Sequence, residues 1–222
     1  MSDELVLYTH PMSRGRIARW MLEEVGRPYR AELLDYGTAM KAPEYLALNP
    51  MGKVPALRHG AVVVTEAAAI CAYLADAFPE AGLAPPPHDR RRGPYYRWLF
   101  FGAGPVEAAV TTKALGLTLP DDPRSRGMAG WGSLEAVQDT LEAALAASDY
   151  LAGESFSAAD VYVGAQLGWG MAFGTIARRP AFERYWQRLA ARPAAARAKS
   201  IDDALLAEPK GTEPQGAGRE GT

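Results

Sequence analysis

Residues 49–57 (Asn-Pro-Met-Gly-Lys-Val-Pro-Ala-Leu), followed after a short turn by residues 61–70 (Ala-Val-Val-Val-Thr-Glu-Ala-Ala-Ala-Ile), decide the fold. They predict two strands joined by a tight hairpin at His59-Gly60, and then a helix that begins at the Thr-Glu pair. The proline where the first strand begins cannot donate to a sheet, so an extended ligand backbone can pair with that edge. The free N–H groups at the start of the helix attract an anion such as a carboxylate.

The elements before and after this stretch alternate between strand and helix. A strand at 5–8, a helix at 14–25 that ends at Gly26, and a strand at 29–34 form a first βαβ-type unit with the hairpin to follow. A short helical piece is expected at 43–48 and a longer helix at 65–78. A βαβ unit followed by a ββα unit is the thioredoxin-like order, so residues 1–80 are predicted to form an α/β domain of that kind.

A proline-rich connector separates this domain from a helical one. Residues 81–89 include Pro85-Pro86-Pro87 and are expected to be a stiff linker. An all-helical domain is predicted over 90–205, with helices near 90–117, 132–147, 158–171 and 181–191 and a shorter one to about 205. Ser157 and Asp160 form a capping box at the start of the third of these helices. Residues 206–222 lack large apolar side chains beyond their first residue and are predicted to be a disordered tail.

Composition indicates an ordinary globular protein and excludes several classes of function. The chain has 222 residues, 48% of them hydrophobic, and a net charge of −2, which gives no electrostatic case for nucleic-acid binding. No apolar run is long enough to span a bilayer and the N-terminus is acidic, so no membrane partner and a cytoplasmic location are expected. A single cysteine, Cys71, excludes an internal disulfide and a Cys-x-x-Cys pair. With three histidines and one cysteine, no metal site is predicted.

The order of elements, together with Val54, Pro55 and Glu66, resembles the glutathione transferase family over roughly the first 200 residues. In that family the strand proline is cis, the valine before it pairs with the cysteinyl part of glutathione, and an acid at the next helix start holds the γ-glutamyl end. Ala67 departs from the pattern, because most members carry serine there. The departure removes one side-chain hydrogen bond, worth about 0.5–1.5 kcal/mol, and leaves the backbone N–H available.

The resemblance implies glutathione as co-substrate and a residue that activates its thiol. A free thiol has a pKa of about 8.5, and lowering it by about two units takes roughly 2.7 kcal/mol of preferential thiolate binding. Ser13 lies where the first helix begins, so its hydroxyl can cap that helix or donate to the sulfur. The surrounding segment resembles the Pro-x-Ser-Arg run of serine-type bacterial and fungal glutathione transferases. In other classes the active residue lies three or four positions earlier, which would select His10 or Thr9.

The remaining candidates concern the glycyl end of glutathione and the pocket for the electrophile. Lys53 can contact the glycyl carboxylate of glutathione, or can simply be an exposed lysine beside a strand. An apolar pocket for a hydrophobic electrophile is expected over the helical domain. Trp98 and Phe101, in the first helix of that domain, are candidate walls, and Trp169 near the end of a later helix is another.

Two classes of function follow. The first is a cytoplasmic, homodimeric glutathione S-transferase with a detoxifying role, in which the thiolate attacks an electrophile; peroxide reduction, disulfide reduction and dehalogenation start from the same thiolate. The second is a non-catalytic module of the same fold that binds a partner protein or sequesters ligands, which Ala67 and the open register at Ser13 favour. A pure scaffold has no chemical need for Lys53, Val54-Pro55, Glu66 and Ser13 together, so the sequence favours the enzyme.

Overall fold

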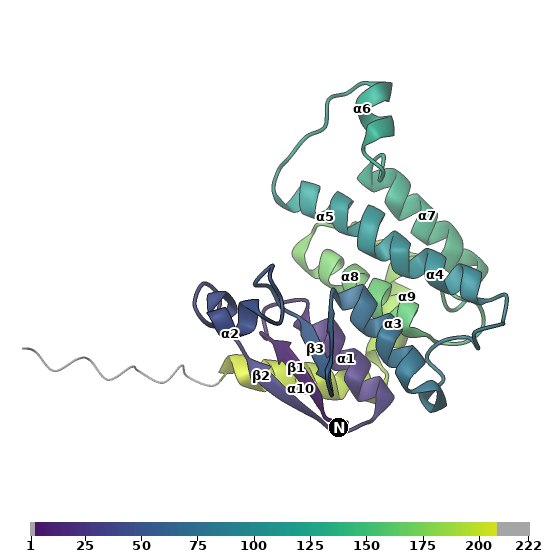
Figure 1. The fold of residues 1–222 in the computed structure, drawn as a ribbon. Helices are drawn as coiled ribbons and strands as arrows, with labels where there is room; N and C mark the ends of the chain where they lie inside the picture. Colours follow the sequence, from purple (N-terminus) through teal and green to yellow (C-terminus); the bar gives the residue numbers. More distant parts are fainter. Residues whose placement is uncertain (1–2, 208–222) are drawn as a thin grey trace, which may run out of the picture.

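A computed structural model describes residues 3–207 and shows an α/β part followed by a helical part (Figure 1). The elements of the α/β part are, in chain order, β1 (Leu5–Thr9), α1 (Gly15–Val25), β2 (Tyr29–Leu33), η1 (Ala39–Lys41), α2 (Pro43–Leu46), β3 (Ala56–His59), β4 (Val62–Thr65), α3 (Ala67–Ala77) and η2 (Pro79–Ala81). The strand order is β2-β1-β3-β4, with β1 parallel to β2 and antiparallel to β3, and β3 antiparallel to β4. This is the thioredoxin-like arrangement that the sequence predicts.

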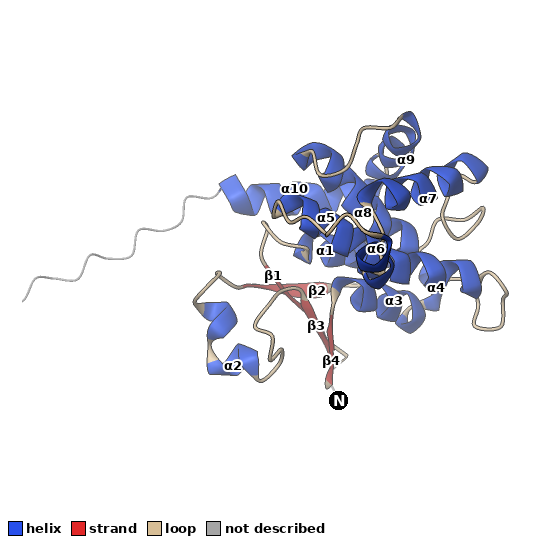
Figure 2. Ribbon diagram, turned by 90° about the horizontal axis from the view of Figure 1, so that it is seen from above, coloured by secondary structure: helices blue, strands red, loops and turns tan. Residues whose placement is uncertain are grey.

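Helices cover both faces of the sheet (Figure 2). Leu5 and Leu7 of β1 belong to the main core, which also contains residues of α1 and α3. Tyr8 and Ala56 lie with Met40 of η1 in a second, smaller cluster on the side of α2. Side chains that alternate along a strand point to opposite faces of the sheet, so β1 serves both clusters.

The helical part has a single long buried helix at its centre. Its elements are α4 (Arg92–Phe101), the π-helical segment η3 (Gly102–Val106), α5 (Glu107–Ala114), α6 (Pro123–Met128), α7 (Leu134–Ala147), α8 (Ala158–Phe173), α9 (Pro180–Ala190) and α10 (Pro193–Ala207). Almost every residue of α8 is buried. Its glycines allow close packing: a Cβ on Gly164 would lie 2.2 Å from Leu189 of α9, and one on Gly168 would lie 2.6 Å from the Trp186 ring.

Two elements of the helical part differ from the sequence prediction. The helix expected over 90–117 is interrupted at 102–106, where Pro105 stands inside the π-helical segment and cannot donate a backbone hydrogen bond. Helix α6 was not predicted; Asp122 caps it by accepting a hydrogen bond from the Ser125 N–H at 2.9 Å.

The predicted capping box at the start of α8 is present. Asp160 accepts hydrogen bonds at 2.9 Å from both the N–H and the hydroxyl of Ser157. Its other oxygen accepts from the Leu151 N–H and from the Tyr185 hydroxyl, each at 2.8 Å. This buried carboxylate therefore fixes the start of α8 and joins it to α9.

Helix α10 returns from the helical part to pack on α1 of the α/β part. Arg19 of α1 pairs with Asp202 of α10 at 2.9 Å, and both side chains are almost fully buried. Arg16 pairs with Asp203 at 2.8 Å in a more exposed position. These contacts, together with the large apolar interface between α3 and α8, hold the two parts in one arrangement.

Three local boundaries were shifted in the sequence prediction. The hairpin turn is Gly60–Ala61 and not His59-Gly60, because His59 still pairs with Val62. Thr65 still belongs to β4, so α3 starts at Ala67. The first residues of the predicted tail, Leu206 and Ala207, are helical, and the rest of it lies outside the described residues. Within 3–207, no helix combines the length and the apolar character needed to cross a membrane.

Candidate functional site

A cavity of about 950 Å³ opens between the α/β part and the helical part. We call it the interdomain cavity. From the α/β part its lining includes the start of α1 and the segments before β3, and from the helical part it includes α5 and α8. The lining side chains used below are Met12, Ser13, Arg14, Arg16, Lys41, Lys53, Val54, Glu107, Val110, Ala114, Gln166, Trp169 and Phe173. Residues predicted to bind glutathione (Ser13, Lys53 and Val54) and a residue predicted to contact the electrophile (Trp169) therefore line one cavity.

Ser13 lies in this wall, just before the first turn of α1. Its hydroxyl donates to the His10 carbonyl at 2.7 Å and accepts from the Gly15 N–H at 2.9 Å. The bond from Gly15 is the capping interaction that the sequence offers as one role for this residue. A hydroxyl has one proton that rotates to suit its acceptor, so a ligand sulfur in the cavity would compete only with the His10 carbonyl.

The two alternatives for the catalytic residue do not line the cavity. Thr9 is fully buried, and within the described residues its Oγ1 has no hydrogen-bond partner. A Cβ on Gly15 would lie only 1.9 Å from that oxygen, so Thr9 is covered by the start of α1. His10 is partly buried; its Nδ1 accepts from the Met12 N–H at 3.1 Å, and its ring centroid lies 4.6 Å from that of Tyr36.

The Lys53-Val54-Pro55 segment passes along the cavity into β3. The Val54-Pro55 bond is cis, as the family resemblance implies. The Lys53 carbonyl accepts from the Tyr45 hydroxyl at 2.6 Å and from Asn49 Nδ2 at 2.8 Å, which fixes the loop. Pairing of β3 with β1 begins only at Ala56, so the Val54 backbone lies beyond the paired part of the sheet.

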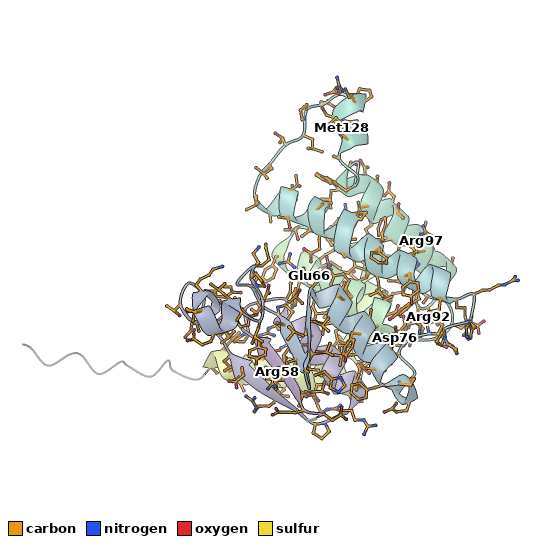
Figure 3. The ribbon with its side chains drawn as sticks, in the orientation of Figure 1. Arg58, Glu66, Asp76, Arg92, Arg97 and Met128 are labelled. Carbon is orange, nitrogen blue, oxygen red and sulfur yellow. The ribbon has the colours of Figure 1, made fainter. Side chains whose placement is uncertain are left out.

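Pro55, Glu66 and Ala67 are not among the residues that line the cavity. Glu66 is exposed at the N-terminus of α3, at the end of the sheet nearest the helical part (Figure 3). Its φ of 66° is in the left-handed region, which is rare and strained for a residue other than glycine. The N-terminal end of α3 thus presents an exposed carboxylate beside free backbone N–H groups.

The apolar wall differs from the sequence expectation. Trp98 is 3% exposed and packs edge-to-face on Phe101, with the Arg97 guanidinium over its ring, and neither Trp98 nor Phe101 lines the cavity. Helix α4 is packed against α3 and α8, so its inward aromatic side chains are core residues. Trp169 of α8, the third candidate, does line the cavity, together with Phe173 of α8 and with Val110 and Ala114 of α5.

Sequence reasoning missed an ion pair in this wall. Arg14 Nε donates to Glu107 Oε1 at 2.6 Å, and Arg14 Nη2 donates to Glu107 Oε2. Gln166 Nε2 also donates to Glu107 Oε1, at 3.2 Å. The hydrogen bond to Glu107 raises the pKa of Arg14, so the guanidinium stays charged. Arg14 and Glu107 are 93 residues apart, and no local sequence signal links them.

Lys41 is a second residue that the sequence analysis did not select. Its Nζ donates to the Gly52 carbonyl at 2.9 Å and to the Met51 carbonyl at 3.2 Å. It therefore places a positive charge in the cavity wall beside Lys53. Within residues 3–207 no group of His, Cys, Asp and Glu side chains is arranged to hold a metal ion.

Comparisons with family models, known sequences and solved structures all match the same family. The family model of the glutathione S-transferase N-terminal domain matches residues 12–77, and that of the C-terminal domain matches residues 129–193. Glutathione S-transferase 3 of Zea mays is 32% identical over 204 residues, which is 86% of this chain and 90% of that protein. The structure of a glutathione S-transferase from Xylella fastidiosa aligns with a TM-score of 0.75 at 30% identity and covers 90% of this chain and 99% of its own. A glutathione transferase homologue from Sulfitobacter, solved with bound glutathione, aligns at 0.71 and 28% identity, with coverage of 90% and 99%.

Proposed function

The chain belongs to the glutathione S-transferase family and is a glutathione transferase, and from this premise we propose how the interdomain cavity binds and activates its co-substrate. Glutathione lies with its sulfur at Ser13 and its cysteinyl backbone along Val54. The observation that carries the proposal is that Ser13 and Val54, 41 positions apart in the chain, line the same cavity.

The two ends of glutathione meet opposite charges in this arrangement. The glycyl carboxylate is placed at Lys53, with Lys41 beside it, because both ammonium groups line the cavity and neither has a carboxylate partner in the part of the chain that the structure describes. The γ-glutamyl end is placed at the start of α3, where the Glu66 carboxylate suits an α-amino group and the Ala67 N–H suits a carboxylate. Pro55 lies between Val54 and the start of β3, and it has no backbone N–H that could pair with the ligand.

Ser13 activates the thiol by hydrogen bonding to its thiolate form. The hydroxyl turns its proton from the His10 carbonyl to the sulfur and keeps the Gly15 N–H as a donor to its own oxygen. That bond polarises the hydroxyl, and the nearby N-terminus of α1 adds a favourable dipole. Charge-assisted hydrogen bonds are worth about 1.5–3 kcal/mol, enough to lower the thiol pKa by one to two units.

The thiolate then attacks a small electrophile held against the apolar wall at Trp169 and Phe173. The described residues include no thiol in the cavity, since the single cysteine, Cys71, is fully buried and burial raises its pKa. Glutathione therefore supplies the nucleophile.

We further propose that the protein works as a homodimer in the cytoplasm. Exposed apolar side chains lie on β4 and on α4. They are Val62 and Val63 on β4 and Tyr96 and Phe100 on α4, with Phe100 73% exposed. A surface of this kind suits a second copy of the chain, with the α/β part of one copy against the helical part of the other. We also propose that the chain is divided into an α/β domain (1–80), a linker (81–89) and a helical domain that begins at residue 90 and continues to the end of α10 at Ala207.

An ultraviolet titration of protein-bound glutathione tests the role of Ser13. Thiolate absorbance is followed against pH in the wild type, in Ser13→Ala and in the isosteric Thr9→Val. We expect the bound thiol to ionise below its free pKa in the wild type and in Thr9→Val, and close to its free pKa in Ser13→Ala. A lowered pKa that survives in Ser13→Ala would refute the assignment. Absence of glutathione binding in the wild type would refute the site as a whole and favour a non-catalytic module.

A further inference from the structure

Arg14 presents a cation to the interdomain cavity directly beside Ser13. Its side chain is 50% exposed, whereas that of its partner Glu107 is 20% exposed. Both side chains line the cavity, and the guanidinium is the more accessible partner of the pair.

Glu107 is held in place from the protein interior. Besides the two bonds from Arg14, it accepts from Gln166 at 3.2 Å and from the Tyr162 hydroxyl at 3.4 Å. Gln166 and Tyr162 are both buried in α8. Both oxygens of the Glu107 carboxylate therefore accept hydrogen bonds from protein groups. By contrast, no hydrogen bond to Arg14 Nη1 is present within the described residues, so that nitrogen has two N–H groups available for a ligand.

The cavity has more positive than negative charge in its wall. Four of its lining side chains are cationic, Arg14, Arg16, Lys41 and Lys53, and Glu107 is its single carboxylate among the described residues. Lys41 and Lys53 lie at the end proposed for the glycyl group of glutathione. Arg16 is paired with Asp203, which does not line the cavity. Arg14 is the cation next to the helical wall, because its partner Glu107 lies on α5, one turn from Val110.

We propose that the electrophile of this enzyme is a flat apolar molecule that carries a carboxylate, and that Arg14 is the residue that selects it. The inference rests on the proposed function and names the substrate class of the same site. The apolar body packs on Trp169 and Phe173, and the carboxylate accepts hydrogen bonds from Arg14 Nη1. Glu107 neutralises the charge of Arg14 only in part, because its carboxylate contacts Nε and Nη2 and leaves Nη1 open to a ligand.

The reaction of such a substrate is balanced without another reactant. With an aryl halide, the glutathione thiolate forms a C–S bond to the ring carbon that bears the halogen. The C–halogen bond then breaks, and the halide leaves with its electron pair. The carboxylate is unchanged and serves only to orient the ring beside Ser13.

A pair of substrates with the same reacting centre tests this inference. 4-Chloro-3,5-dinitrobenzoate and 2-chloro-1,3-dinitrobenzene both carry a chlorine flanked by two nitro groups and differ only in the carboxylate para to the chlorine. The quantity measured is the ratio of their kcat/KM values at saturating glutathione. Arg14→Gln removes the cation and exposes Glu107, so the ratio is expected to fall by about five- to tenfold. Glu107→Gln leaves Arg14 uncompensated, so the ratio is expected to rise by about as much.

The two variants are expected to change the kcat/KM ratio in opposite directions, which separates recognition of the substrate carboxylate from a structural role of the ion pair. Both variants break the same ion pair, so a purely structural role would change both ratios in the same direction. Arg126→Gln, which removes a cation of the distant α6 and breaks its exposed pair with Asp121, serves as the control for a general loss of positive charge and should leave the ratio unchanged. Equal ratios in the wild type and the two cavity variants would overturn the inference while leaving glutathione activation intact. A wild type that fails the glutathione titration would overturn both.

Discussion

The buried ion pair between α1 and α10 allows a quantitative prediction about how the two parts are held together. Arg19 Nε lies 2.9 Å from Asp202 Oδ1, and the two side chains are only 2% and 1% exposed. Arg19 Nη1 also donates to the Tyr29 hydroxyl at 3.3 Å, while Arg19 Nη2 and Asp202 Oδ2 have no partner in residues 3–207. Asp202→Ala therefore leaves a buried guanidinium without its counter-charge.

The expected cost is about 3–5 kcal/mol, the usual range for breaking a buried pair by removing one partner. This is a large part of a total stability of about 5–15 kcal/mol. The neighbouring Asp203 provides a matched control on the same helix, because its side chain is 42% exposed and its pair with Arg16 is open to solvent. Asp203→Ala should cost no more than about 1 kcal/mol.

Urea unfolding followed by circular dichroism measures both variants, at one protein concentration because association shifts apparent stability. With a slope of about 2–3 kcal/mol per molar urea, Asp202→Ala should lower the midpoint by roughly 1–2 M. Arg19→Met/Asp202→Leu should recover most of the loss, since an apolar pair of similar volume avoids the cost of burying charge. Equal losses in Asp202→Ala and Asp203→Ala would refute the argument from burial.

Two further predictions concern the same region and the start of α1. Burial raises the pKa of Asp202 above its unfolded value. This carboxyl therefore favours the folded state most below its unfolded pKa, and that contribution is lost as pH rises through its folded pKa. The wild type should gain stability relative to Arg19→Met/Asp202→Leu on acidification, and a constant difference in the free energy of unfolding across the acidic range would contradict this. Gly15→Ala places a Cβ 1.9 Å from Thr9 Oγ1, so it should cost about 1–3 kcal/mol in thermal unfolding, and Thr9→Ala should restore part of the loss; a neutral Gly15→Ala would show that α1 shifts freely at this point.

Sequence patterns succeeded where the determining interactions are local. The hairpin and the capping box at Ser157 depend on residues within a few positions of one another, and both are present. The cis bond before Pro55, which the family resemblance implies, is present as well. The turn was misplaced by one residue, because His59 has no property that separates the end of a strand from the start of a turn. The glycines that precede Pro105 mark a break in the helix predicted over 90–117, and the π-helical segment Gly102–Val106 lies there.

The cavity wall shows where sequence reasoning fails. Trp98, Phe101 and Trp169 are all aromatic residues on helices, and periodicity alone cannot say which face of a helix meets a cavity and which meets the core. Only the packing of α4 on α3 and α8 buries Trp98, and only the packing of α8 places Trp169 in the wall of the cavity that Ser13 also lines. Arg14 and Glu107 are ordinary charged residues in the sequence until α5 is brought against the start of α1.

The sequence by itself determined the order of strands and helices along the chain, the α/β and helical parts, and the position of Val54-Pro55 just before β3. These follow from side-chain periodicity, from the conformational limits of proline and glycine, and from capping chemistry, all of which act over a few residues. The tertiary structure decided which side chains share the cavity, which ion pairs are buried, and that Arg14 is more exposed than its partner Glu107. These outcomes depend on contacts between residues tens to hundreds of positions apart, and burial, which sets their energies, exists only once the helices have packed.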